Sequence, residues 1–142
     1  MTIEDVPFTF LSCYFPAEAK KGSKNTHGDH TQAFLDDKLS PVVKDFIARG
    51  HNVLAFCDAN ARVGIPAVDD EEEADRWRGA CSTDATCNEA GLALIEFCQA
   101  LDFRIEDTFH EPPLEGSGTW QHPDRVGVYA NAIDHTLVHL CL

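Results

Sequence analysis

The chain has 142 residues, 44% of them hydrophobic, which is enough for about one globular domain with its own core. Its 24 acidic and 11 basic residues give a formal charge of −13, which opposes long-range attraction to a polyanion such as nucleic acid. No apolar run is long enough to span a bilayer, and the N-terminus lacks the basic and apolar regions of a signal peptide. We therefore expect a soluble, intracellular protein.

The six cysteines are expected to be reduced thiols. Disulfides are less favoured in a chain of this length without a secretory signal. Cys13, Cys57 and Cys98 lie in apolar runs, where cysteine behaves as a small hydrophobic residue. No Cys-x-x-Cys pair is present, which argues against a cysteine-based zinc site.

The first predicted element is a buried strand over residues 7–15, an apolar run rich in aromatic residues. Residues 17–30 are polar and are predicted to form a loop. This loop contains Lys20, Lys21 and Lys24, which makes it the best local candidate for a phosphate contact. A solvated loop without any ligand explains the same residues.

Residues 31–49 are predicted to be helical. Pro41 interrupts this segment and Ser40 is a suitable N-cap, so we expect a kink or two abutting helices. Gly50 occupies the position of a C-terminal cap. The apolar residues at helical spacing on one face are Leu35, Leu39, Val42, Val43 and Phe46.

A second buried strand is predicted over residues 52–57, directly before Asp58. Residues 67–75 form a dense acidic run that could chelate a cation, although consecutive like charges more often form a solvated loop. Residues 88–101 are predicted to form a second amphipathic helix. Its apolar face contains Leu94, Ile95, Cys98 and Leu101.

The last part of the chain is predicted to hold a short strand over residues 103–107 and a final strand over residues 132–140. Between them, residues 111–118 contain prolines and glycines and are predicted to form a loop, after which Thr119-Trp120 opens another element. Strands that alternate with helices indicate a layered α/β or α+β fold.

Asp58 and Asn60 follow the end of a buried strand, where layered folds place ligand-binding groups. On an extended chain two residues apart, their side chains would point the same way. Asp58 offers a proton acceptor or metal ligand, and Asn60 offers an uncharged amide donor for a phosphoryl oxygen. An Asx-type turn that closes the strand explains the pair equally well.

Asp134 interrupts an apolar strand and is therefore expected to need a partner. The functional interpretation is that it orients a catalytic imidazole, and the alternative is a structural hydrogen bond to backbone. His135 follows directly, but adjacent strand residues face opposite sides, so the two are not expected to pair with each other.

Two further features are ambiguous when taken alone. The segment His27-Gly28-Asp29-His30 has the composition of a metal motif, but nothing else in the sequence supports metal binding there. Tyr14, at the end of the first predicted strand, is by itself a typical packing residue.

Taken together, these segments resemble the endonuclease/exonuclease/phosphatase superfamily, most closely the endonuclease domains of non-LTR retrotransposons and the craniofacial-development-protein-like sequences. The segments that carry the resemblance, in the family's order, are Tyr14-Phe15-Pro16, Cys57-Asp58-Ala59-Asn60-Ala61-Arg62-Val63-Gly64, Asn88-Glu89-Ala90-Gly91 with Leu94-Ile95-Glu96-Phe97-Cys98, Thr108-Phe109, Thr119-Trp120 and Ile133-Asp134-His135. A single Asp-x-Asn motif is a weak signal, whereas the ordered set is specific.

The resemblance implies a four-layered α/β sandwich of the DNase I-like type and Mg²⁺-dependent cleavage of a phosphodiester, with DNA as the partner. Asp58 would act on the attacking water or the leaving oxygen and is the one candidate metal ligand. Asn60 would hold that group in place, Tyr14 would hydrogen-bond the phosphate, and Asp134 would orient the catalytic histidine. Acid–base help of this kind is typically worth about 10²–10⁴-fold in rate.

The chain also departs from the family's pattern. The metal-binding Glu expected before the Tyr-x-Pro strand and the Ser-Asp-His segment expected after the Ile-Asp-Tyr strand have no counterpart here. Cys57 stands where Gly is usual, and His135 where Tyr is common. Asp134-His135 could itself correspond to the Ser-Asp-His motif, but the apolar strand around it fits the earlier motif better. We therefore expect a single partial domain with little or no activity alone.

The sequence leaves two other functions open. The first is a phosphatase-type hydrolase of the same superfamily that acts on a small phosphoester, which the charge of −13 favours over nucleic acid. The second is a non-catalytic remnant of a nuclease fold that acts as an interaction module.

Overall fold

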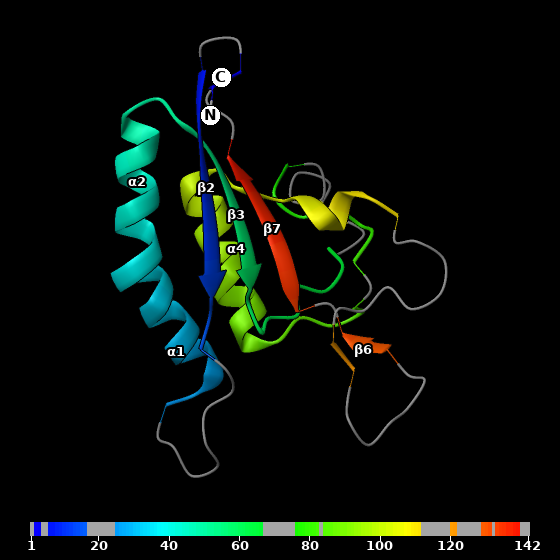
Figure 1. The fold of residues 1–142 in the computed structure, drawn as a ribbon. Coiled ribbons are helices and arrows are strands. Elements are labelled where there is room, and N and C mark those ends of the chain that lie inside the picture. Colours follow the sequence, from blue (N-terminus) through cyan, green and yellow to red (C-terminus); the bar gives the residue numbers. More distant parts are fainter. Residues whose placement is uncertain are drawn as a thin grey trace.

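A computed structural model of the chain describes residues 2–3, 6–16, 25–66, 76–82, 84–111, 120–121, 129–131 and 133–139. The fold is mixed α/β, as the sequence predicts (Figure 1). Its helical elements are α1 (His27–Phe34), η1 (Leu35–Leu39), α2 (Ser40–Ala48), α4 (Glu89–Leu101) and η2 (Glu106–Phe109). Its strands are β1 (Thr2–Ile3), β2 (Val6–Tyr14), β3 (Asn52–Asp58), β4 (Arg104–Ile105), β5 (Trp120–Gln121), β6 (Tyr129–Asn131) and β7 (Asp134–His139).

The main sheet is mixed and has the strand order β1-β2-β3-β7-β4. The central strands β2 and β3 are parallel, and β7 pairs antiparallel with β3 on the other side. The helices α1, α2 and α4 lie on one side of this sheet, while the other side carries no helix in the part of the chain that the structure describes (Figure 1). The strands β5 and β6 form a separate antiparallel pair.

The core lies between the sheet and the helices. Alternate residues of β3, Val53, Ala55 and Cys57, point into it and are almost fully buried. The residue between the last two, Phe56, points to the opposite face and is 50% exposed. A period of two is what a strand imposes when only one of its faces is covered.

The first helical segment begins earlier than predicted, at His27 instead of residue 31. Thr26 and Asp29 form a capping box, in which the Asp29 amide donates to the Thr26 hydroxyl and the Thr26 amide to the Asp29 carboxylate. The predicted break near Pro41 is confirmed, because α1 passes through the π-helical turn η1 before α2 begins. The prediction of Ser40 as an N-cap is wrong, because Ser40 has helical backbone angles and is the first residue of α2. The side chain of Val42, predicted to be on the buried face, is 44% exposed.

The predicted second helix is confirmed as α4, with Asn88 as its N-cap. The Asn88 Oδ1 atom accepts hydrogen bonds from the backbone amides of Gly91 at 2.8 Å and Arg62 at 3.1 Å. At Gly91 an added Cβ would lie 1.9 Å from the Arg62 carbonyl oxygen, so only glycine permits this close contact. Asn88 and Gly91 therefore fix α4 against the segment that follows β3.

The strand predicted over residues 103–107 is only partly correct. The strand β4 covers Arg104–Ile105, and the chain then turns into the 3₁₀ helix η2. The Thr108 hydroxyl stabilises this turn, since it donates to the Ile105 carbonyl at 2.6 Å and accepts from the Gly79 amide at 2.7 Å. The final predicted strand is confirmed as β7.

Several expectations fall on residues outside the described ranges: the lysines of residues 20–24, the acidic run of residues 67–75 and most of the loop predicted over residues 111–118. Within the described ranges, no helix has the length and apolar character needed to cross a membrane.

Candidate functional site

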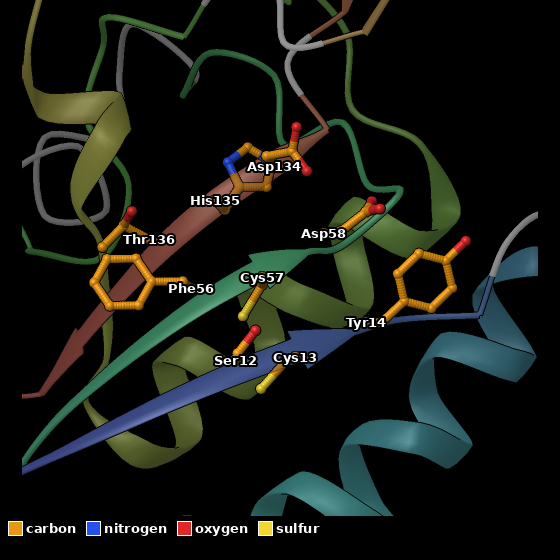
Figure 2. Close-up of a pocket in the computed structure, with 9 residues that line it drawn as sticks. All are labelled: Ser12, Cys13, Tyr14, Phe56, Cys57, Asp58, Asp134, His135 and Thr136. Atoms are coloured by element: carbon orange, nitrogen blue, oxygen red, sulfur yellow. The ribbon is translucent and has the colours of Figure 1, made fainter.

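Three of the four residues selected from the sequence meet at one end of the open sheet face. In the strand register, Tyr14 of β2 is opposite Asp58 of β3, and Asp58 is opposite Asp134 of β7. Side chains at paired positions of neighbouring strands lie on the same face, so a phenol and two carboxylates form a row across the sheet (Figure 2). This row is the candidate site.

The row borders a shallow hollow of about 530 Å³. The residues that line it are Ser12, Cys13, Tyr14, Phe56, Cys57, Asp58, Asp134, His135 and Thr136. Tyr14 is 69% exposed, so its hydroxyl is accessible to a ligand. The volume falls in the range of roughly 300–1,000 Å³ that is usual for small-molecule sites.

Asp58 has an unusual electrostatic environment. Burial and the nearby negative charge of Asp134 raise the pKa of the Asp58 carboxyl group above its ordinary value, although a hydrogen bond from the Asn60 backbone amide opposes the shift. Its Oδ1 atom is buried without a hydrogen-bond partner within the described part of the chain. A carboxylate with a raised pKa and a free oxygen suits either proton transfer or binding of a cation.

Asn60 does not join this row, which corrects the expectation that Asp58 and Asn60 point the same way. The strand β3 ends at Asp58, and Asn60 has a φ of +50°, so the extended geometry required for a period of two is lost. The Asn60 side-chain amide donates to the Phe15 carbonyl at 3.3 Å. Asn60 thus ties the turn after β3 to the end of β2. The Asx-turn alternative corresponds to a different contact, the hydrogen bond from the Asn60 backbone amide to the Asp58 carboxyl group.

Asp134 is exposed, whereas the apolar sequence around it suggested burial. The strand β7 alternates, and the residues of the covered face are His135 and Leu137. Asp134 lies on the open face, where it raises the pKa of Asp58 through like-charge repulsion.

The buried polar residue of β7 is His135, which is 4% exposed. Its Nδ1 atom lies 2.8 Å from Asp107 Oδ2, and its Nε2 atom lies 2.9 Å from the Ala61 carbonyl oxygen. A carboxylate and a carbonyl both accept, so both ring nitrogens must donate, and only the imidazolium form does this. Burial lowers the pKa of His135, but the hydrogen bond and charge of Asp107 outweigh it and raise that pKa overall.

The carboxyl group of Asp107 responds in the opposite direction. Burial raises its pKa, but the hydrogen bond and charge of His135 and the backbone amide of Thr136 lower it overall. The Asp107 Oδ1 atom accepts from this Thr136 amide at 2.9 Å. The ion pair therefore joins β7, η2 and the segment after Asn60 directly behind the candidate site.

The segment after Ala61 has a second support on the same side. The buried Arg78 guanidinium donates from Nη1 to the Val63 carbonyl oxygen. Gly64 follows with a φ of +66°, and an added Cβ there would lie 2.8 Å from the Cys87 backbone nitrogen. The backbone beneath the candidate site is thus fixed by buried polar contacts.

The donor set at the open end is small. Within the described ranges, no group of three or more His, Cys, Asp or Glu side chains is arranged to hold a metal ion. Asp58 and Asp134 occupy paired positions of β3 and β7. Mg²⁺ characteristically uses one or two protein carboxylates and keeps several waters. The buried, unpartnered Asp58 Oδ1 fits such an ion. At the His27–His30 segment, by contrast, His27 contacts the Pro16 carbonyl and Asp29 caps α1.

Sequence reasoning missed Asp107 and the buried role of His135. The alternation of β7 was visible in the sequence, and it places His135 opposite Asp134. Asp107 is 28 residues away from His135, and no sequence pattern indicates that they meet.

A scan against protein-family models, a search of curated proteins and a search of solved structures each found no match.

Proposed function

We propose that the row of Tyr14, Asp58 and Asp134 is part of a Mg²⁺-dependent phosphodiester hydrolase site of the DNase I-like type. The observation that carries the proposal is the register of these three side chains across β2, β3 and β7. The ordered motifs of the sequence support the same family, since Tyr14 and Asp58 are the positions to which the resemblance assigns phosphate binding and proton transfer.

The described residues supply distinct parts of this chemistry. Asp58 exchanges a proton with the attacking water or the leaving oxygen. The exposed Tyr14 hydroxyl donates a hydrogen bond to a phosphate oxygen. Asp58 and Asp134 together would hold the cation, and bound Mg²⁺ would stabilise negative charge on the phosphate. Asn60 acts as a positioning residue through its bond to Phe15.

We expect the site to have only weak activity. Catalytic groups that act as a unit lose most of their effect when some are missing. The described donor set has two facing carboxylates and no third metal-binding group. The role that the resemblance implies for Asp134, orientation of a catalytic histidine, stays a prediction. The neighbouring His135 does not fill the place of that histidine, because it is buried on the covered face and pairs with Asp107.

The test is cleavage of supercoiled plasmid DNA by a large excess of protein, with Mg²⁺ and with EDTA. We expect slow, Mg²⁺-dependent nicking that Asp58→Asn reduces by about 10²-fold or more, to background. Tyr14→Phe is expected to reduce the rate about tenfold or more, because one hydrogen bond to a charged group is lost. Asp37→Asn, an exposed carboxylate in η1, serves as the control purified in the same way.

Calorimetric titration with Mg²⁺ tests the same carboxylates without activity. Asp58→Asn and Asp134→Asn should each weaken binding, while Asp37→Asn should not. Nicking and Mg²⁺ binding that are both unaffected by Asp58→Asn would show that this row is not the site.

A small phosphoester is the second candidate substrate, and the charge of −13 favours it. The assay is repeated with bis(p-nitrophenyl) phosphate and with p-nitrophenyl phosphate. Faster Asp58-dependent turnover of either compound than of DNA would assign the site to small substrates.

A further inference from the structure

Cys13 and Cys57 form a pair of thiols on neighbouring strands beside the candidate site. They are direct partners in the parallel register of β2 and β3, and each is the penultimate residue of its strand. Figure 2 shows their side chains on adjacent strands, both pointing the same way. Cys57 is 3% exposed, Cys13 is half-buried, and both are free.

The two thiols differ in their exposure. Cys13 is half-buried, so a small oxidant can reach its sulfur, whereas Cys57 is almost fully buried. The susceptibility of a thiol to oxidation follows its exposure, so Cys13 reacts first and the buried Cys57 is its partner.

We propose that Cys13 and Cys57 form a reversible disulfide when a hydroperoxide oxidises Cys13. In the first step the Cys13 thiolate attacks one peroxide oxygen, the O–O bond breaks, and hydroxide leaves and takes up a proton, which gives a sulfenic acid and water. In the second step the Cys57 sulfur attacks the Cys13 sulfur, the S–O bond breaks, and the hydroxyl group leaves as water with the Cys57 proton. Two thiols are oxidised, and one peroxide is reduced to two waters.

The spacing of the strands allows this bond but strains it. Neighbouring strands lie about 4.8 Å apart, which is within the roughly 4.4–6.8 Å that a disulfide needs between Cα atoms. The Cβ atoms of a disulfide must approach to about 3.5–4.5 Å, so the two strand ends have to draw together slightly. Strained disulfides are the readily reduced ones, which makes the bond a reversible modification.

The bond would act on the candidate site without depending on the proposed function. Cys13 directly precedes Tyr14, and Cys57 directly precedes Asp58. Drawing the two strand ends together changes the separation of these two side chains, whatever ligand they bind. Formation of the Cys13–Cys57 disulfide can therefore be tested whether or not the site is a hydrolase.

The experiment treats dilute wild-type protein with a few equivalents of hydrogen peroxide, blocks remaining thiols with N-ethylmaleimide and maps disulfide-linked peptides by mass spectrometry. The expected product is a Cys13–Cys57 linkage within one chain, lost after dithiothreitol. In Cys57→Ala, Cys13 should accumulate as a sulfenic acid that dimedone labels. Cys81→Ala, which removes a partly exposed thiol elsewhere, should leave the linkage unchanged.

Three outcomes would overturn the proposal. One is a linkage of Cys57 to the buried Cys98 of α4, which also lies close enough to affect the pKa of Cys57. Another is a linkage between Cys13 residues of two chains. The third is oxidation confined to other thiols while Cys13 is recovered unmodified in the wild-type protein, a result that does not depend on how any variant folds.

Discussion

The two faces of the central sheet use the same strands for different purposes. On the covered face, Leu137 is fully buried and the charged His135 is matched by Asp107. On the open face, Phe10, Phe56 and Tyr14 are 53%, 50% and 69% exposed. The difference teaches that single-residue alternation along β2, β3 and β7 separates the side chains of the core from those of the candidate site. Substitutions on the two faces can test this separation.

The largest contrast is expected between Leu137→Ala on the covered face and Phe56→Ala on the open face. Leu137→Ala leaves a cavity in the core and should lower the free energy of unfolding by about 2–5 kcal/mol. Phe56→Ala removes a larger side chain, but half of it is exposed, so its effect should be well below that of Leu137→Ala. Urea denaturation followed by circular dichroism measures both.

Equal losses for these two variants would break the comparison, because they would show that Phe56 is covered in solution. Repeating the denaturation at two protein concentrations sharpens the result. A midpoint that rises with concentration in the wild type, and not in Phe56→Ala, would mean that another copy of the chain provides the cover.

Adjacent residues of β7 give the next contrast. His135→Ala leaves the Asp107 carboxylate without its cation and the Ala61 carbonyl without its donor. Losing one partner of a fully buried pair costs about 3–5 kcal/mol, and the 35% exposure of the Asp107 side chain reduces the expected loss to about 2–3 kcal/mol. Asp134→Ala, on the open face, should stay within about 0.5 kcal/mol of the wild type.

The same urea experiment decides between the two sides of β7. A His135→Ala loss no larger than that of Asp134→Ala would mean that the buried ion pair does not stabilise the fold. Destabilisation by Asp134→Ala of more than about 1 kcal/mol would assign Asp134 a structural role, the alternative interpretation of its position.

The His135–Asp107 pair also predicts how stability depends on pH. The pKa of His135 is raised in the folded state, so its contribution is complete below the unfolded value of about 6.5 and is lost as pH rises through the folded value. The pKa of Asp107 is lowered, so its contribution is present above about 3.9 and is lost as pH falls through the folded value. The stability difference between wild type and His135→Ala should therefore be greatest between about pH 4 and 6.5.

This difference is measured from urea midpoints at several pH values, which cancels the titration of groups common to both proteins. A difference that grows from pH 6 to pH 9 would contradict the raised pKa and the doubly donating imidazolium of His135.

Periodicity predicted the main helices and strands of the mixed α/β fold. The apolar runs that became β2 and β3 and the spacing that became α4 are local signals, and Pro41 marked the change from η1 to α2. The errors in the predicted bounds also have local causes. A capping box extended α1 to His27, and the Thr108 hydroxyl turned the end of β4 into η2.

The candidate site was only partly predictable, for a different reason. Tyr14, Asp58 and Asp134 each follow from position on a strand, so their common location needed only the strand order. The orientation predicted for the Asn60 side chain was wrong because a single positive φ ends the alternation. Asp107 was missed because its partner His135 is brought to it by tertiary packing.

The smallest expected contrast is between the N-caps of α4 and α1. It tests how the helices are joined to the segment after β3. Asn88 Oδ1 caps α4 through Gly91 and also accepts from the Arg62 amide, so Asn88→Ala removes two bonds and should cost about 1–2 kcal/mol. Thr26→Ala, the matched cap of α1, is exposed and should cost about 0.5–1 kcal/mol. Equal losses in urea would show that the bond to Arg62 adds nothing. A larger loss for Asn88→Ala would mean that the α4 cap also holds the backbone just after Asn60 and Ala61, so that the helix layer supports the open face through this one side chain.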